Sequence, residues 1–382
     1  MARTFDIVVA GGSVAGLAFA SEAAKNGCSV LVAEEHGEIG EPEKCDGLVS
    51  LRGLRKYGYP PDPQVVQNRI ASAVIHSPCG RRFVLNAMAL DVVVLDRSAF
   101  DKQVADAAVA NGAVLEKEVR VDGAEVRSDG VVVKVGDESV HSKFLVDATG
   151  PTSSPRHGIL PAAKCELEAD WVREHVVEVF LDAQKYPGFF AWVIPFGRHK
   201  AKVGAAGYGI SPYKALDGFL AGRNAMILRR VSAPIYIGGP APNFIEGRRI
   251  FVGESAGQVK PTTAGGIMTS IAGAVIAAKW TCESVRKNRP ALLENYQKEW
   301  EGAFLKEMKT MLRLRGVFEK LSNSDLDGVF SAFATSKLSV KLSQTDFDFH
   351  ASGLLGALGV SGLLRVAKVV ASAEVRSLLV EN

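Results

Sequence analysis

The chain has 382 residues, of which 47% are hydrophobic and 23% charged, and 45 Lys and Arg against 42 Asp and Glu leave a net charge of +3. This composition is that of a globular protein with two or three domains, and it excludes a disordered chain, a collagen-like repeat and a small disulfide scaffold. The balanced charge gives no sign of the basic surface that binds nucleic acid.

The cysteines are five in number and widely spaced, without a CxxC pair or a Cys/His cluster. This pattern indicates neither a zinc site nor a disulfide framework, so we expect no metal and a reducing, cytoplasmic location. The N-terminus lacks the features of a signal peptide, and no uncharged apolar stretch is long enough to span a membrane.

The first 34 residues predict a βαβ unit. Residues 5–10 form an apolar, β-branched run typical of a buried strand, a glycine turn follows at 11–16, and an Ala-rich helix extends to about residue 26. A second strand at 29–33 ends at Glu34. This is the building block of a parallel sheet.

The rest of the chain predicts further strands and then helices. After a loop-rich stretch at 40–60, residues 69–94 alternate between apolar and polar around a turn at 78–80, which predicts an antiparallel hairpin. The remaining expected elements are a helix at 98–111, strands at 113–121, 130–135 and 142–146, a strand-rich region at about 170–250, and helices from 265 to the C-terminus.

The glycine turn has the spacing of a dinucleotide-binding motif, Gly11-x-Ser13-x-Ala15-Gly16, with Glu34 eighteen residues after its last glycine. Such a turn brings backbone N–H groups and a helix N-terminus to a pyrophosphate, and the acid accepts hydrogen bonds from ribose hydroxyls. A tight strand–helix turn without a ligand is the alternative. The strand before it, the helix after it and the position of the acid favour dinucleotide binding.

Three later segments resemble the FAD-dependent hydroxylase superfamily with the para-hydroxybenzoate hydroxylase type of fold. They are the helix start at Arg97, the strand and turn ending at Glu254, and the helix that opens at Gly266 and Ile267. The resemblance implies FAD as the cofactor, with Glu254 near the ribitol and Arg97 in contact with the cofactor. It also implies that Val121 flanks the adenine.

A second dinucleotide fingerprint is missing. Residues 203–209 contain glycines, but no acid follows at the required distance and the flanking residues favour strands. We therefore expect no separate NAD(P) domain, and an external electron donor such as ferredoxin, NAD(P)H or another reductant.

Two further motifs resemble the geranylgeranyl reductase family, in particular its archaeal members that act on ether lipids. Residues 42–47 match the PxxCxG signature, and residues 190–195 are similar to YxWxFP, with Phe190 in place of Tyr and Ile194 in place of Phe. The C-terminal segments at 321–326 and 353–365 resemble the same reductases.

This resemblance implies the roles of several residues. Cys45 becomes a candidate for contact with the flavin and, tentatively, for a catalytic part such as proton delivery, whereas a lone Cys is otherwise an inert hydrophobe. Asp46 and Leu48 become further cofactor contacts. The candidates for lining the substrate tunnel are Phe190, Trp192 and Pro195.

The implied fold is α/β with an α+β insert, in which a Rossmann-type FAD-binding domain is assembled from discontinuous segments. We expect this domain to comprise 1–70, 97–150 and 250–300. A β-rich substrate domain comprises 71–96 and 151–249, and a helical C-terminal region comprises 301–382.

The implied activity is FAD-dependent hydrogenation of C=C bonds in the geranylgeranyl chains of archaeal ether phospholipids, with a hydride from N5 of reduced FAD. Three alternatives remain: a flavin-dependent monooxygenase or halogenase, a chlorophyll-type geranylgeranyl reductase, and a non-catalytic FAD protein that binds lipid or carries electrons. Residues 190–195 are close to the halogenase signature WxWxIP, but the lack of lysine between Gly58 and Asp101 disfavours halogenation.

The C-terminal stretch at 353–379 is apolar with interspersed cations, Arg365, Lys368 and Arg376. Such a helix can lie on an anionic membrane surface, here the inner face of the cell membrane, or pack against the main domain. Both interpretations stay open.

Overall fold

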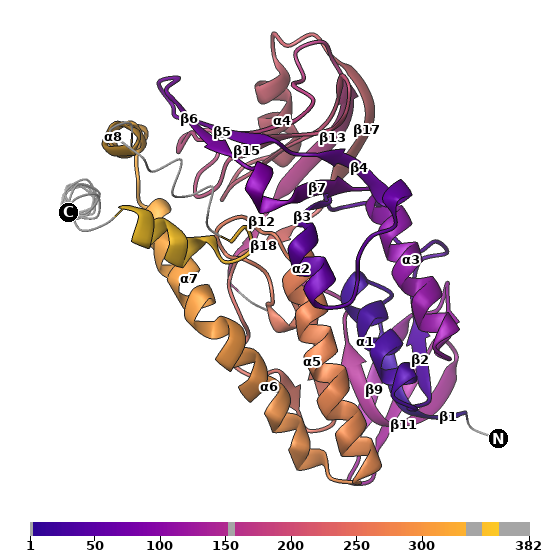
Figure 1. The fold of residues 1–382 in the computed structure, drawn as a ribbon. Coiled ribbons are helices and arrows are strands. Elements are labelled where there is room, and N and C mark those ends of the chain that lie inside the picture. Colours follow the sequence, from indigo (N-terminus) through magenta and orange to yellow (C-terminus); the bar gives the residue numbers. More distant parts are fainter. Residues whose placement is uncertain (1–2, 152–156, 334–345, 359–382) are drawn as a thin grey trace.

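The computed structural model describes residues 3–151, 157–333 and 346–358. A mainly parallel sheet and a mainly antiparallel sheet lie at opposite ends of the molecule, and long helices run beside the parallel one (Figure 1). The α/β class with a β-rich insert that the sequence predicts is confirmed.

The first sheet is built on five parallel strands. They pair in the order β8 (Val114–Glu116), β2 (Val30–Ala33), β1 (Thr4–Ala10), β11 (Glu138–Asp147) and β20 (Arg249–Phe251). The central strands are buried on both faces, as in other parallel sheets, and the predicted first βαβ unit is confirmed.

Three antiparallel strands complete this sheet: β9 (Val121–Val126), β10 (Val131–Val135) and β19 (Ile245–Glu246). The prediction of one strand over 113–121 is wrong. The segment divides into β8 and the start of β9, and between them Glu118 takes a left-handed φ of 59° that turns the chain.

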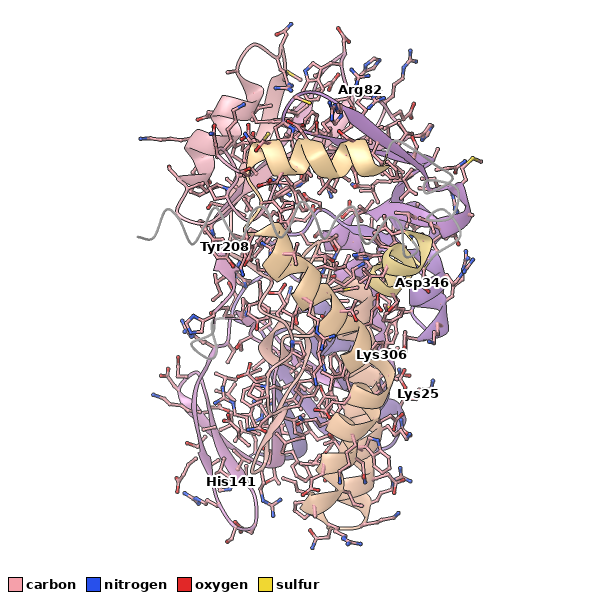
Figure 2. All side chains as sticks on the ribbon, turned by 90° about the vertical axis from the view of Figure 1, so that its left-hand side faces the viewer. Lys25, Arg82, His141, Tyr208, Lys306 and Asp346 are labelled. Atoms are coloured by element: carbon pink, nitrogen blue, oxygen red, sulfur yellow. The ribbon has the colours of Figure 1, made fainter. Side chains whose placement is uncertain are left out.

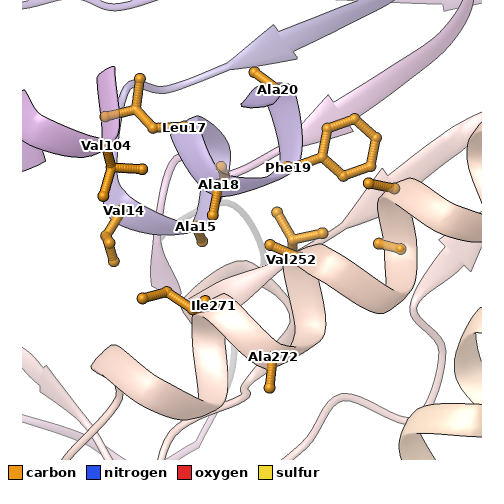
Figure 3. Packing of buried hydrophobic residues seen from close by; sticks show 14 of the residues in the cluster. Val14, Ala15, Leu17, Ala18, Phe19, Ala20, Val104, Val252, Ile271 and Ala272 are labelled. Carbon is orange, nitrogen blue, oxygen red and sulfur yellow. The ribbon is translucent and has the colours of Figure 1, made fainter. Parts of the chain in front are cut away.

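Three helices pack together beside the parallel strands: α1 (Val14–Lys25), α3 (Arg97–Ala110) and α5 (Ile267–Arg286). Ten of the twelve residues of α1 are buried, and many of them are alanine, so α1 and α5 approach closely. Figure 3 shows this contact, with Ala15 and Ala18 of α1 on the side of α5 that carries Ile271, whereas Ala272 points away from α1. The small side chains therefore set the distance between the first and last parts of this domain.

The second sheet has seven strands, and every neighbouring pair except β14 and β5 is antiparallel. A helix, α4 (Pro212–Leu220), packs on it. In spatial order the strands are β17 (Met226–Ser232), β13 (Ala162–Glu168), β16 (Lys200–Ala206), β15 (Ala191–Gly197), β14 (Val176–Phe180), β5 (Ser72–His76) and β6 (Arg82–Asn86).

The hairpin predicted over 69–94 is only partly confirmed. Strands β5 and β6 form a hairpin, but the chain on either side joins a separate three-stranded sheet. Asp91, with a left-handed φ of 50°, ends the alternating pattern. The predicted loop at 40–60 also contains regular structure, namely β3 (Leu48–Ser50) and α2 (Leu51–Lys56). The other elements beside the hairpin are η1 (Pro63–Val65), β4 (Val66–Arg69), η2 (Met88–Leu90) and β7 (Val92–Leu95).

The last part of the described chain is helical, as predicted from residue 265 onward. Figure 2 shows α8 lying across the end of the molecule where Arg82 is labelled, and the segment that starts at Asp346 beside α7. The remaining elements are the strand pair β12 (Ile159–Leu160) and β18 (Ile235–Tyr236), and the helices η4 (Gly253–Ala256), η5 (Pro290–Leu293), α6 (Glu294–Trp300), η6 (Glu301–Leu305), α7 (Lys306–Phe318), α8 (Asn323–Phe333) and 350–358.

Within the described ranges, no helix combines the length and the apolar character needed to cross a bilayer. The stretch predicted to lie on a membrane or on the main domain is helical over 353–358, and the rest of it, 359–379, lies outside the described residues.

Candidate functional site

A cavity of about 1380 Å³ opens between the two large sheets. It exceeds the roughly 300–1,000 Å³ of a typical small-molecule pocket, so it has room for an extended cofactor together with a second ligand. Its walls bring together most of the residues singled out from the sequence, namely Gly11, Ser13, Ala15, Glu34, Cys45, Asp46, Leu48, Arg97, Val121, Phe190, Trp192, Glu254, Gly266 and Ile267.

The glycine turn and the start of α1 form one end of this cavity. Gly11 has a left-handed φ of 98°, and Ser13 caps the helix by accepting a hydrogen bond from the N–H of Gly16 at 3.4 Å. The first turn of α1 therefore presents backbone N–H groups to the cavity.

Gly16 has a different role because it is not a lining residue. A Cβ at this position would lie 2.1 Å from the carbonyl oxygen of Gly11 and 3.1 Å from the Cβ of Ala148. Gly16 thus allows α1 to pack directly on its own entry turn.

Glu34 lies at the end of β2, beside the glycine turn. Its Oε2 accepts a hydrogen bond from the N–H of Gly12 at 2.6 Å, and its Oε1 accepts one from the N–H of His36 at 2.9 Å. These contacts fix the carboxylate in the wall of the cavity. Val121 lines the same part of the cavity.

Arg97 and Asp101 form a buried ion pair at the start of α3. The guanidinium donates to both carboxylate oxygens of Asp101, at 2.9 and 3.0 Å. Burial lowers the pKa of Arg97, but Asp101 and the neighbouring Cys45 outweigh this effect and raise it. Burial also raises the pKa of Glu254, against the opposing charges of Arg97 and Lys44. Arg97 therefore stays charged beside Cys45.

The two motifs at 42–47 and 190–195 meet in the middle of the cavity. The indole N–H of Trp192 donates to Oδ2 of Asp46 at 2.8 Å. On the other side, Nζ of Lys164 donates to the carbonyl oxygen of Cys45 at 2.8 Å and lies 3.3 Å from Oδ1 of Asp46. Cys45 itself is exposed and faces the cavity.

A second ionic contact holds the same loop. Nζ of Lys202 donates to Oε1 of Glu43 at 2.5 Å, and both side chains are almost fully buried. Burial acts to raise the pKa of Glu43, but Lys202, Lys164 and Arg229 outweigh it, so the pKa lies below its usual range. The sequence analysis missed Lys164 and Lys202. A signal was available, because each lysine interrupts a small, apolar strand segment.

The other half of the cavity is apolar and is formed by one face of the seven-stranded sheet. The rings of Phe189 and Phe190 stack with centroids 3.9 Å apart, and Trp192 meets them edge-on. Pro195 is buried outside the lining, and its carbonyl oxygen accepts a hydrogen bond from Asn68 at 2.8 Å. The aliphatic lining comes mostly from Ala73, Ile75, Leu85, Val177, Val179 and Ile194.

The segment 346–354 contributes the wall near the start of α5. Nζ of Lys260 lies 3.1 Å from Oδ1 of Asp348 and 4.3 Å from the ring centroid of Phe347. Burial raises the pKa of Asp348, and Lys260 opposes this rise. No motif in the sequence marks this wall, because its residues come from two distant segments.

His350 in this wall predicts a pH dependence of stability. Burial, reinforced by the charge of Lys260, lowers the pKa of His350 to about 4. The carbonyl oxygen of Phe347 accepts from Nδ1 at 3.2 Å, which leaves Nε2 to accept from the hydroxyl of Thr262 at 2.8 Å.

The folded protein therefore keeps His350 neutral, whereas the unfolded chain takes up a proton as the pH falls below about 6.5. We expect this group to lower the free energy of unfolding by about 1–2 kcal/mol between pH 7 and pH 5. Urea unfolding at pH 7 and pH 5 measures this free energy for the original protein and for His350→Gln. We expect the contribution of His350 to the pH dependence to be absent from the variant. His141→Gln, at an exposed position visible in Figure 2, is the control and leaves the dependence unchanged.

No protein-family model matches this chain, but individual proteins are similar to it. Digeranylgeranylglycerophospholipid reductase 2 of Methanopyrus kandleri is 30% identical over 361 residues, which cover 86% of this chain and 90% of that protein.

Two solved structures share the fold. A geranylgeranyl bacteriochlorophyll reductase-like protein from Thermoplasma acidophilum superimposes with a TM-score of 0.85 at 22% identity, covering 98% of this chain and 99% of that one. The halogenase PltM in complex with phloroglucinol and FAD gives a TM-score of 0.69 at 17% identity, covering 96% and 86% of the two chains.

Proposed function

This chain belongs to the digeranylgeranylglycerophospholipid reductase family, and from that premise we propose that it uses FAD to hydrogenate C=C bonds in the geranylgeranyl chains of ether phospholipids. The observation that carries the proposal is the single cavity that joins a dinucleotide-type turn to an apolar sheet face. The PxxCxG loop and Trp192 lie where these two halves meet.

The cofactor half fits a flavin dinucleotide. A Cβ at Gly11 would lie 2.8 Å from the backbone carbonyl oxygen of Ala148, and Gly11 has a left-handed φ of 98°, so this turn requires a residue without a side chain. The N–H groups at the start of α1 suit the pyrophosphate, and Glu34 suits a ribose. The glycine turn, the start of α1 and Glu34 would hold reduced FAD, whose chemistry would be the transfer of a hydride to one alkene carbon.

The protein's own residues supply position and a proton. The apolar face holds a flexible prenyl chain in one orientation and excludes bulk water, which reduces the entropic cost of bringing an alkene to the reacting position. Cys45 lies at the junction of the two halves, where its thiol can hold the proton that the second alkene carbon receives. Each saturated bond thus gains one hydride and one proton.

Replacing Cys45 with alanine tests this role. We expect turnover to fall at least tenfold with normal FAD content, because the proton must then come from less well-placed water. Anaerobic single-turnover kinetics measure the change. Cys79→Ala removes another exposed thiol, in the β5–β6 turn, and is the matched control. Unchanged turnover in Cys45→Ala would show that the thiol has no catalytic part.

The activity itself is tested without oxygen. The flavin is reduced with dithionite, geranylgeranyl phospholipid is added, and flavin reoxidation and lipid mass are followed together. We expect reoxidation with a gain of two hydrogens per reduced bond. A reduced flavin that persists beside unaltered lipid would contradict the proposal, and oxygen-dependent hydroxylation or halogenation would instead support the monooxygenase alternatives.

We also propose that an external donor, such as ferredoxin or NAD(P)H, reduces the flavin. The glycine-containing segment at 203–209 supports this, because it continues strand β16 of the antiparallel sheet and does not open a helix. Since the proposed substrate is a membrane lipid, we further propose peripheral contact with the membrane surface.

A further inference from the structure

Three neighbouring strands place Trp192, Gly204 and Lys164 in one row across the seven-stranded sheet. Trp192 of β15 pairs with Gly204 of β16, and Gly204 pairs with Lys164 of β13. A Cβ at Gly204 would lie 2.2 Å from Cζ2 of Trp192, so the indole lies directly over the glycine and reaches toward the lysine.

Asp46 bridges the two ends of this row. Its Oδ2 accepts the indole N–H of Trp192, and its Oδ1 forms an ion pair with Lys164. The side chains of Asp46 and Lys164 are only 16% and 6% exposed. A carboxylate this far removed from water is costly unless such partners hold it, which makes the arrangement specific.

The row also fixes the backbone of Cys45, because Lys164 donates to its carbonyl oxygen at 2.8 Å. The sulfur side of Cys45 lies against the guanidinium of Arg97. Farther back along the loop, Lys202 holds Glu43. Two ion pairs, Lys164–Asp46 and Lys202–Glu43, therefore hold the loop on either side of Cys45, while its thiol faces the cavity.

From this geometry we infer that Asp46, clamped between Trp192 and Lys164, is a positioning residue that sets the place of the Cys45 thiol. The inference rests on the proposed function for its effect on turnover. It also assigns Trp192 a task beyond lining the substrate tunnel, since its N–H group ties one motif to the other.

The first test measures Cys45 directly and needs no lipid substrate. In the FAD-bound protein, we expect Trp192→Phe and Lys164→Met each to slow the alkylation of Cys45 by iodoacetamide at least threefold at pH 7. The reason is that a released loop no longer holds the thiol facing the cavity, where the reagent reaches it. Peptide mass spectrometry follows the modification of this one cysteine.

Trp171→Phe is the matched control. It removes an indole N–H that donates to the carbonyl oxygen of Asn224 at 2.9 Å, outside the main cavity. We expect no change in the alkylation of Cys45 in this variant. An alkylation rate that is unaltered in both Trp192→Phe and Lys164→Met overturns the inference, whether or not the protein reduces geranylgeranyl lipid.

The second test asks whether the clamp acts through Cys45. We expect Trp192→Phe and Lys164→Met each to lower kcat about tenfold with FAD content and KM within twofold of the original protein. In a Cys45→Ala background the same substitutions cause no further loss, because the group that they position is gone. A further tenfold loss in that background assigns Trp192 and Lys164 an independent role and overturns the inference.

Discussion

Replacing Gly16 with alanine is expected to lower the flavin content of the purified protein more than tenfold. The added methyl group would lie 2.1 Å from the carbonyl oxygen of Gly11, and this contact is with backbone that cannot swing aside. The helix must move away from its entry turn, and the N–H groups that face the cavity move with it. The ratio of flavin absorbance to protein concentration measures the loss.

Gly218→Ala is the control for this substitution. Gly218 lies inside α4, and a Cβ there would meet nothing within 4 Å, so alanine adds a better helix former without a clash. We expect normal flavin content in this variant. A full complement of flavin in Gly16→Ala would instead show that the glycine turn does not hold the cofactor.

Replacing Ala73 with phenylalanine is expected to lower turnover of a geranylgeranyl lipid about 100-fold, while a lipid with the shorter geranyl chain keeps its rate within about threefold. From β15, which carries Trp192, the apolar face continues through β14 and β5 to the edge strand β6. With strands about 4.8 Å apart, this path is roughly 14 Å long. A phenyl ring at Ala73 blocks its distal part, where only the longer chain reaches.

The pair of substrates tests this prediction internally, because a general loss of folding or flavin would reduce both rates. Ser72→Phe places the same ring on the opposite face of β5, since neighbouring residues in a strand alternate. We expect it to leave the ratio of the two rates unchanged. Equal losses for both chains in Ala73→Phe would mean that the prenyl chain does not cross β5.

The parts of the site that the sequence predicts are those encoded within one short segment. The glycine turn with Glu34 is such a case, because strand, turn, helix and acid follow one another directly in the chain. Cys45 and Trp192 could also be found, since each carries a motif on neighbouring residues.

The contacts between segments could not be predicted in the same way. Lys164 meets Asp46 only because the registers of β13, β16 and β15 align their residues in one row, and no local pattern specifies that register. The wall around His350 likewise depends on how the segment 346–354 packs against Lys260. Hydrophobic alternation over 69–94 was misleading for a related reason, because such a pattern does not show that β5 and β7 join different sheets.

The pairing order of the parallel sheet also determines when this sheet can be completed during translation. Thr4 of β1 pairs with His141 of β11, and Asp147 of β11 pairs with Phe251 of β20. A ribosome that has released only the glycine turn has not yet released the strands that hold it in place. Such non-local pairing makes folding slow. We therefore expect the proposed flavin cofactor to bind only after most of the sheet has formed, so that its binding free energy adds to stability late in translation.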